Sequence, residues 1–203
     1  MNREQYEWAN IWWNNANDEK LPRALLIGDS ISVGYGGPVT ELLKGKANVD
    51  RLSTSKAIDD EAFAKETAYM LGEYRYSAVH FNNGLHGWHV ADDVFESSLE
   101  RYAKKLRELA KGAKLVWASI TPVTKEGDTN ALNTDMNYTV IRRNVIAVRV
   151  MRKLGISVND LYTLVLGKAD LRASDGVHYN NDGYQLMGKA VAKAIEEGMG
   201  KRG

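Results

Sequence analysis

Short apolar runs alternate with longer segments of helical periodicity along almost the whole chain, and this alternation limits the fold more than any other feature. The apolar runs are typical of strands buried on both faces and cover residues 24–28, 48–52, 77–81, 114–120 and 156–159. Helical spacing of apolar residues follows each run, over residues 33–44, 59–73, 92–111, 134–154 and 183–197. This order predicts an α/β fold, a three-layer α/β/α sandwich with a five-stranded parallel sheet. In such sheets the functional site lies beyond the carboxyl ends of the strands.

The two ends of the chain lie outside this alternation. Before the first strand, four aromatic residues recur at roughly helical spacing: Tyr6, Trp8, Trp12 and Trp13. We therefore expect a helix over residues 4–17, within an N-terminal helical extension (1–20) that covers the edge of the domain. Residues 198–203 are expected to form a flexible tail. The length of 203 residues favours one domain over residues 1–203.

The composition narrows the classes of function. The chain has no cysteine, which excludes disulfides, thiolate zinc sites, iron–sulfur clusters and cysteine nucleophiles. Its formal net charge is +1 with no long run of either sign, so a nucleic-acid partner is not expected. No window approaches the roughly 18 apolar residues of a membrane span, and the first residues do not resemble a signal peptide. These features indicate a soluble enzyme or binding module and assign neither a compartment nor an oligomeric state.

The first candidate functional residue is Ser30, which follows the first predicted strand in the segment GDSIS, residues 28–32. A serine at a strand-to-helix turn can expose its hydroxyl beside the helix N-terminus. Taken alone, the motif is more typical of an N-cap, because serine is among the residues that most often begin a helix.

A second polar segment, SDGVHYN at residues 174–180, precedes the last predicted helix. Asp175 and His178 are three residues apart, so the carboxylate can hold one imidazole nitrogen while the other faces Ser30. A serine hydroxyl is a poor nucleophile until a base takes its proton. A carboxylate fixes the tautomer of that base and stabilises the imidazolium that forms. The alternative for this segment alone is an Asp-capped turn with a surface histidine.

Together, GDSIS after the first strand and DGVHYNNDGY before the last helix resemble the first and last motif blocks of the SGNH (GDSL-type) hydrolases. The resemblance covers nearly the whole chain in the family's order. It implies a flavodoxin-like sheet and a serine esterase or acylhydrolase that needs no metal or organic cofactor. It also implies that Ser30 is the nucleophile, Asp175 the triad acid and His178 the base.

The oxyanion hole is where the sequence departs from this family. The third block of the family is Gly-x-Asn-Asp, whereas this chain has GLHG at residues 84–87, so His86 stands where an asparagine would donate to the oxyanion. A neutral histidine has one N–H to offer. Asn82 and Asn83, immediately upstream, are alternative donors.

Backbone donors of the oxyanion hole are also altered. The second block of the family normally supplies a glycine N–H, but the corresponding segment, residues 51–55, has no glycine. The N–H of Ser53 or Thr54 could serve instead, beside that of Ser30. Loss of one such donor typically lowers kcat about 100- to 1000-fold, so these replacements matter for activity.

Other clusters have simpler explanations. His86 and His89 have the spacing of some metal pairs, but no dedicated ligand pattern accompanies them, and no metal site is expected. Asp29 and Trp88 are candidates for the substrate pocket, although Trp88 could equally have a packing role. Four arginines on one predicted helix are interpreted as a solvated face: Arg142, Arg143, Arg149 and Arg152.

The leading functional hypothesis is a serine esterase for small-molecule or carbohydrate esters. No insertion is long enough to form a lid or deep acyl tunnel, which favours acetyl and other short acyl groups, with acetylated carbohydrates as the expected class. One alternative is a catalytically inactive carbohydrate- or partner-binding module on the same fold. The other is a lipase or thioesterase of the same family.

Overall fold

The structure, a computed structural model, describes residues 3–200 of the chain. Its strands are β1 (Ala9–Trp12), β2 (Arg23–Gly28), β3 (Asn48–Thr54), β4 (Ala78–Phe81), β5 (Lys114–Ala118), β6 (Thr124–Lys125), β7 (Asp128–Leu132) and β8 (Ser157–Asn159). Its helices are α1 (Ser30–Leu42), α2 (Glu61–Glu73), α3 (Asp92–Leu109), α4 (Thr134–Leu154), α5 (Leu161–Val165), the 3₁₀ helix η1 (Ala169–Leu171) and α6 (Asn181–Met199).

Six of these strands form one sheet in the order β1-β3-β2-β4-β5-β8. Five strands are parallel, and β1 pairs with β3 in the antiparallel direction. The five parallel strands correspond to the predicted ones, and their order is the 2-1-3-4-5 arrangement of flavodoxin-like sheets. The predicted architecture is therefore confirmed, with one correction: the sheet has a sixth, antiparallel edge strand.

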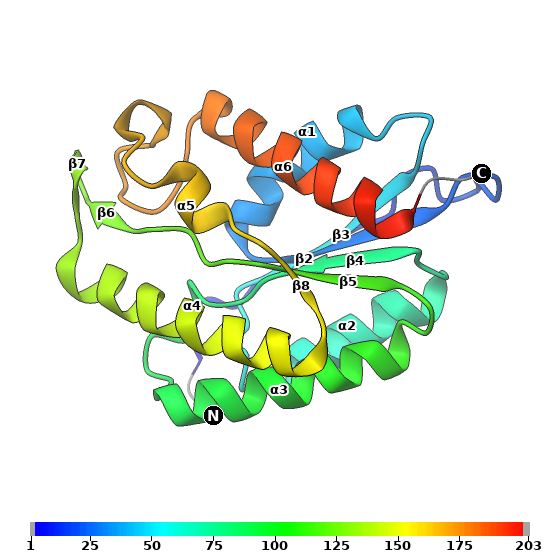
Figure 1. Cartoon of the computed structure of the whole chain (residues 1–203), viewed down its shortest axis with the longest axis horizontal. Helices are drawn as coiled ribbons and strands as arrows, with labels where there is room; N and C mark the ends of the chain where they lie inside the picture. The colour runs from blue at the N-terminus through cyan, green and yellow to red at the C-terminus, as the bar shows by residue number, and fades with distance from the viewer. Residues whose placement is uncertain (1–2, 201–203) are drawn as a thin grey trace.

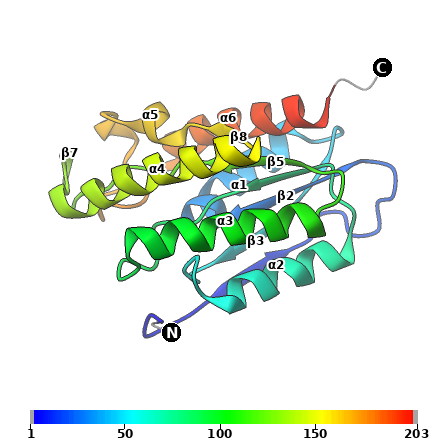
Figure 2. The same ribbon diagram turned by 60° about the horizontal axis from the view of Figure 1, so that its bottom comes forward.

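Two layers of helices enclose the sheet (Figure 1). Helices α1 and α6 pack together on one face, while α2, α3 and α4 cover the other, as the rotated view also shows (Figure 2). The central strand β2 is buried along its whole length, which is why its sequence is continuously apolar between Ala24 and Ile27. The loops that lead from helices into strands lie at the right of Figure 1, so the carboxyl ends of the parallel strands lie at the left.

The N-terminal helix predicted over residues 4–17 is wrong. Residues 9–12 form the edge strand β1, whose register pairs Ile11 with Leu52. Ile11 and Trp13 pack against the core, and the ring of Trp13 meets Tyr69 of α2 edge-on at a centroid distance of 5.8 Å. The segment does cover the edge of the sheet, as expected, but it does so by pairing with β3 as a strand.

The flexible tail predicted over residues 198–203 is also partly wrong. Helix α6 continues to Met199, and the Cβ that an alanine would place at position 198 lies 3.0 Å from the side chain of Lys114. The last turn of α6 is therefore packed beside β5. Residues 201–203 lie outside the described residues.

Four short elements between β5 and α6 were not predicted. Strands β6 and β7 form a hairpin, and α5 and η1 follow β8. In Figure 1 they lie at the left, at the carboxyl ends of the strands. Their backbone contacts help to position the loop that carries Asp175 and His178.

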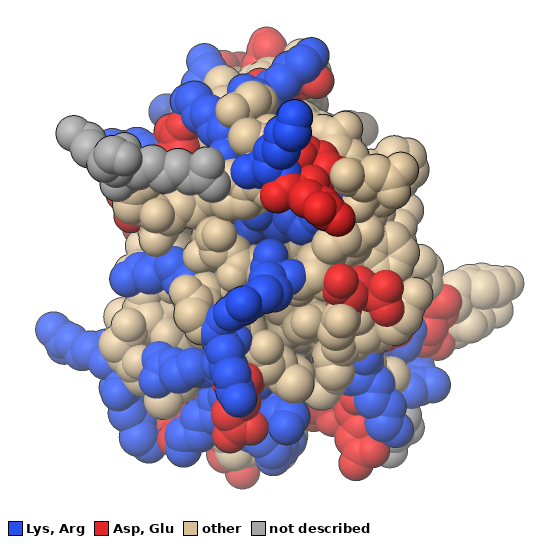
Figure 3. Space-filling view, turned by 90° about the vertical axis from the view of Figure 1, so that its right-hand side faces the viewer, with Lys and Arg blue, Asp and Glu red and all other residues tan. Residues whose placement is uncertain are grey.

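The surface and the helices bear on possible environments. Among residues 3–200, no helix is both long enough and apolar enough to cross a membrane. Basic and acidic side chains both occur on the face at the amino ends of the strands, with a basic stretch bordered by acidic groups (Figure 3).

Candidate active site

Ser30 is placed by the turn from β2 into α1. The carboxylate of Asp29 caps the helix by accepting a hydrogen bond from the N–H of Ile31 at 2.9 Å. Ser30 is then the first helical residue, and its own N–H donates to no acceptor within residues 3–200. The preceding Gly28 permits this close turn, because a Cβ there would lie 2.9 Å from the Cβ of Ser32. The sequence therefore leaves both a hydroxyl and a free backbone donor at the helix start.

Asp175 and His178 lie on a loop between η1 and α6. One oxygen of the Asp175 carboxylate accepts the backbone N–H groups of Val177 and His178, at 2.9 and 2.8 Å. The other oxygen lies 2.7 Å from Nδ1 of His178. Burial acts to raise the pKa of Asp175, but the hydrogen bonds from His178 and Val177 outweigh it and hold that pKa below its ordinary value. Asp175 is therefore an ionised acceptor for the imidazole.

His178 joins this loop to Ser30. Its Nε2 lies 2.7 Å from Oγ of Ser30. Because the carboxylate of Asp175 accepts the proton on Nδ1, the neutral imidazole has its lone pair on Nε2 and accepts the Ser30 hydroxyl proton. This Ser30–His178–Asp175 chain of hydrogen bonds has the geometry of an activated nucleophile.

A buried arginine holds the histidine loop in place. The guanidinium of Arg172 donates to the backbone oxygens of Gly176, at 2.6 Å, and Pro122, at 2.9 Å, and to the hydroxyl of Tyr179. Gly176 has a φ of 82°, and a Cβ there would lie 2.5 Å from the backbone oxygen of Thr124. The loop therefore depends on glycine and on Arg172 for its shape.

A second buried arginine holds the loop that follows β4. Arg143 is 1% exposed and donates to the backbone oxygens of Gly84 at 2.8 Å and Gly87 at 2.7 Å, with longer bonds to His86 and Val90. The interpretation of this arginine as part of a solvated face is wrong. Four carbonyls of an irregular loop need donors, and one guanidinium supplies them.

His86 is the predicted oxyanion donor on this loop, and it is partly exposed. Its Nδ1 lies 2.6 Å from a carboxylate oxygen of Glu4, a residue that the sequence did not suggest. The ring meets Trp8 edge-on at 6.2 Å between centroids. Burial raises the pKa of the Asp29 carboxyl, and a positive charge on His86 or His178 would act to lower it.

The amide side chains of the two alternative donors are engaged elsewhere. Nδ2 of Asn82 donates to the backbone oxygen of Ala118 at 2.7 Å, and Nδ2 of Asn83 donates to that of Lys56 at 2.8 Å. Both residues are buried. These bonds tie the end of β4 to β5 and to the segment after β3.

Ser53 is buried within β3, where its Oγ shares a hydrogen bond with Oγ of Ser32 at 2.6 Å. The backbone N–H of Ser55 donates to the oxygen of Trp8. Donors alternate along an antiparallel ladder, so the N–H of Ser53, paired with Asn10, also faces β1. The edge strand therefore occupies this predicted backbone donor.

The remaining predicted pocket residues differ in position. Asp29 is buried and lines a cavity of about 10 Å³ beneath the start of α1, together with Asn82 and Leu85. Such a volume holds roughly one water molecule. Trp88 is 37% exposed and lies 5.6 Å above the guanidinium of Arg143, which gives it at least a packing contact. No group of three or more His, Asp or Glu side chains suited to a metal ion occurs among residues 3–200.

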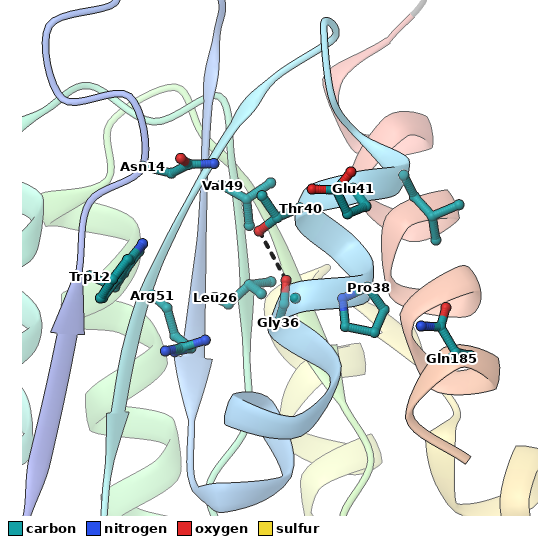
Figure 4. Close-up of a pocket in the computed structure, with 12 residues that line it drawn as sticks. Trp12, Asn14, Leu26, Gly36, Pro38, Thr40, Glu41, Val49, Arg51 and Gln185 are labelled. Atoms are coloured by element: carbon teal, nitrogen blue, oxygen red, sulfur yellow. Dashed lines mark hydrogen bonds between the residues drawn. The ribbon is translucent and has the colours of Figure 1, made fainter. Parts of the chain in front are cut away.

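A groove of about 630 Å³ lies away from these residues (Figure 4). Trp12 of β1 and Arg51 of β3, which are paired across the strands, line it opposite Gly36 and Thr40 of α1. Neither the triad candidates nor the predicted oxyanion donors line this groove.

Solved structures share this fold. A GDSL-like lipase from Bacteroides thetaiotaomicron has a TM-score of 0.67 and 16% identity, over 89% of this chain and 90% of that one. An acetylxylan esterase from Geobacillus stearothermophilus has a TM-score of 0.67 and 16% identity, over 89% and 95%. An α/β hydrolase enzyme from the metagenome of Lake Arreo has a TM-score of 0.67 and 13% identity, over 89% and 97%.

Comparison of the amino-acid sequence alone identifies no related protein. No protein-family model matches it, and no curated protein matches it. Because the structural matches are only 13–16% identical, they establish the fold alone. The chain has the SGNH (GDSL-type) hydrolase fold, as the two motif blocks implied.

Proposed function

We propose that this protein is a serine esterase. The observation that carries the proposal is the continuous set of hydrogen bonds from Ser30 through His178 to Asp175, with both distances at 2.7 Å. Its position at the carboxyl ends of the strands is where this type of sheet holds functional sites. The fold shared with a lipase and an acetylxylan esterase supports the same class of reaction.

The reaction proceeds through an acyl-enzyme. Oγ of Ser30 attacks the ester carbonyl while Nε2 of His178 takes its proton, and the imidazolium then protonates the leaving alcohol. A water molecule, deprotonated by His178, attacks the acyl-enzyme and releases the acid. Asp175 stabilises the imidazolium in both half-reactions. The free N–H of Ser30 is available to the oxyanion.

The proposed substrates are acetyl and other short acyl esters. The cavity lined by Asp29 and Ile31, the two neighbours of Ser30 in the sequence, has room for roughly one water molecule, which favours a short acyl group over a long chain. Each buried CH₂ contributes about 0.8 kcal/mol to binding. A shallow site cannot bury the CH₂ groups of a long acyl chain, so a longer chain adds little affinity. The acetylxylan esterase among the structural neighbours supports acetylated carbohydrates as the class.

A series of p-nitrophenyl esters tests both parts of this proposal. We expect kcat/KM to be highest for the acetate or butyrate and to fall for the octanoate and palmitate, with Ser30→Ala inactive on all four. A maximum at octanoate or longer would favour the lipase or thioesterase alternative. Absence of hydrolysis of every ester would favour the binding module.

A further inference from the structure

The groove in Figure 4 has two walls that differ in chemistry. Trp12 of β1 and Arg51 of β3 form one wall, and Gly36 and Gly37 of α1 belong to the other. Because Trp12 and Arg51 are direct partners in the antiparallel ladder, their side chains lie on the same face of the sheet, with their Cβ atoms about 4.5–5.5 Å apart. This is the face that α1 covers, since a Cβ on Gly36 would lie 2.8 Å from Nη1 of Arg51. The groove therefore presents an aromatic ring and a cation side by side.

The charge of Arg51 has no acidic partner within residues 3–200. The side chain is half-buried, and its guanidinium makes one hydrogen bond in that part of the chain, from Nη2 to Oδ1 of Asn10 at 2.9 Å. Burial lowers the pKa of Arg51, and no neighbouring carboxylate opposes this. Glu41 also lines the groove, but its exposed carboxylate lies 3.8 Å from Nζ of Lys44. A partly buried cation without a counter-ion favours a ligand that carries a negative charge.

Trp12 supplies apolar surface beside this cation. Its side chain is 59% exposed, although tryptophan is highly buried on average. The face of an aromatic ring carries partial negative charge, so it attracts the C–H groups on one face of a sugar ring. Asn14, Thr40 and Gln185 add amide and hydroxyl groups that can donate to and accept from sugar hydroxyls. The volume of about 630 Å³ lies within the usual range for small-molecule sites.

Gly37 keeps the groove open at a cost to the helix. It lies inside α1, where glycine is less favourable than any residue except proline. Contact with Arg51 explains the glycine at position 36, but a Cβ on Gly37 would meet no atom within 4 Å. Packing therefore does not require glycine at position 37, whereas an unobstructed groove does. Such departures from local preference are expected at functional sites.

We propose that this groove binds a sugar that carries a carboxylate, a uronic acid residue, with its ring against Trp12 and its carboxylate on the guanidinium of Arg51. A carboxylate can accept two parallel N–H bonds from an arginine, which a neutral sugar cannot reproduce. The sugar hydroxyls face the amide and hydroxyl groups that line the groove. Ser30, His178 and Asp175 do not line it, so this binding is a separate property that does not require the esterase proposed above.

Titrations with methyl β-D-glucuronoside and methyl β-D-glucoside test this site, because the two sugars differ only in a carboxylate or a CH₂OH at C6. Calorimetry measures Kd, and the NMR signal of the Trp12 indole N–H locates the site. The glucuronoside should shift that signal to saturation, and the glucoside should bind about tenfold more weakly or worse. Arg51→Gln should remove this preference by weakening the binding of the glucuronoside. Trp12→Ala should weaken the binding of both sugars.

Gly37→Leu should block the groove while keeping or raising the Tm, because leucine is a strong helix former and its side chain starts in open space. Arg142→Gln is the matched control, since it removes a partly exposed guanidinium that lies outside the groove, and it should leave Kd unchanged. Ser30→Ala should bind the glucuronoside as the wild type does, so a failure of the esterase proposal would leave this result intact.

Three results would overturn the proposal. The first is that the glucuronoside produces no saturable shift at Trp12. The second is that Arg51→Gln binds it as tightly as the wild type does. The third is that inorganic phosphate displaces it at equal concentration, which would indicate a general anion site without recognition of the sugar.

Discussion

Oγ of Ser30 lies 2.7 Å from Nε2 of His178, although 148 positions separate the two residues in the sequence. Each is placed by its own local structure. Ser30 is fixed by the Asp29-capped start of α1, and His178 by a loop that the guanidinium of Arg172 holds together. Substitution of either side chain should therefore remove chemistry while leaving the fold in place.

Ser30→Ala and His178→Ala should each lower kcat by about 10⁴-fold or more, because neither group acts without the other. The double variant should be scarcely worse than either single one. Steady-state kinetics of the three proteins on p-nitrophenyl acetate measure this. Losses that multiply in the double variant would mean that the two residues act independently.

Acid solution should lower kcat/KM through His178 and not through Asp175. The hydrogen bonds that Asp175 accepts keep its pKa below the ordinary carboxyl value, so Asp175 stays ionised in mildly acidic solution. A protonated His178 cannot accept the Ser30 proton. Asp175→Ala should retain more turnover than Ser30→Ala, since Asp175 orients the base and does not bond to substrate. A pH profile of kcat/KM that stays flat from neutral to strongly acidic solution would argue against imidazole catalysis.

Arg143→Lys should lower both stability and turnover. A lysine ammonium can satisfy some of the four carbonyls that Arg143 reaches, but it lacks the planar fork that reaches them together. Since a hydrogen bond to a charged group contributes about 1.5–3 kcal/mol, we expect the free energy of unfolding to fall by about 2–4 kcal/mol. Denaturant unfolding measures this loss, and kcat should fall as the loop of His86 loosens.

The neighbouring Arg142 provides the control. Its guanidinium is partly exposed and pairs with Asp92 at 3.0 Å at the surface. Arg142→Lys should change stability by less than about 1 kcal/mol and leave kcat unaltered. Equal effects at positions 142 and 143 would contradict a specific role for Arg143.

The stability of the fold should decrease in acid because of His80. Burial lowers the pKa of His80 to about 3, whereas an ordinary histidine has a pKa near 6.5. The unfolded chain therefore takes up this proton first, and folding free energy is lost as the pH falls from about 6.5 towards 3. One such group contributes a slope of about 1.4 kcal/mol per pH unit. Unfolding of His80→Gln across that range should show a slope shallower by this amount, and identical slopes would show that His80 is not the source.

The parallel strands and the candidate triad could be predicted because their signals are local. Residues 24–28 are apolar without interruption, and helix α4 has the bounds that its periodicity indicated. Ser30, Asp175 and His178 each lie in a short motif that indicates its chemical role without knowledge of the fold. The structure adds the distances between the three side chains, which cannot be obtained from their spacing along the sequence.

The remaining features depend on contacts between distant segments. Ile11 and Trp13 alternate with Asn10 and Trp12 as in a strand, but the four-residue spacing of Trp8 and Trp12 also matches one face of a helix. Arg143 looks like its exposed neighbours in sequence, because the carbonyls that it binds belong to an irregular loop more than 50 residues away. Glu4 could not be linked to His86 for the same reason.

Labelling with a fluorophosphonate probe tests the central claim most directly, because the probe reacts with a serine only when a base and an oxyanion site activate it. Intact-protein and peptide mass spectrometry should find one adduct per chain, located on Ser30. Labelling should be abolished in Ser30→Ala and strongly slowed in His178→Ala. A native chain that stays unlabelled, or an adduct that persists in Ser30→Ala, would contradict the assignment of Ser30 as an activated nucleophile.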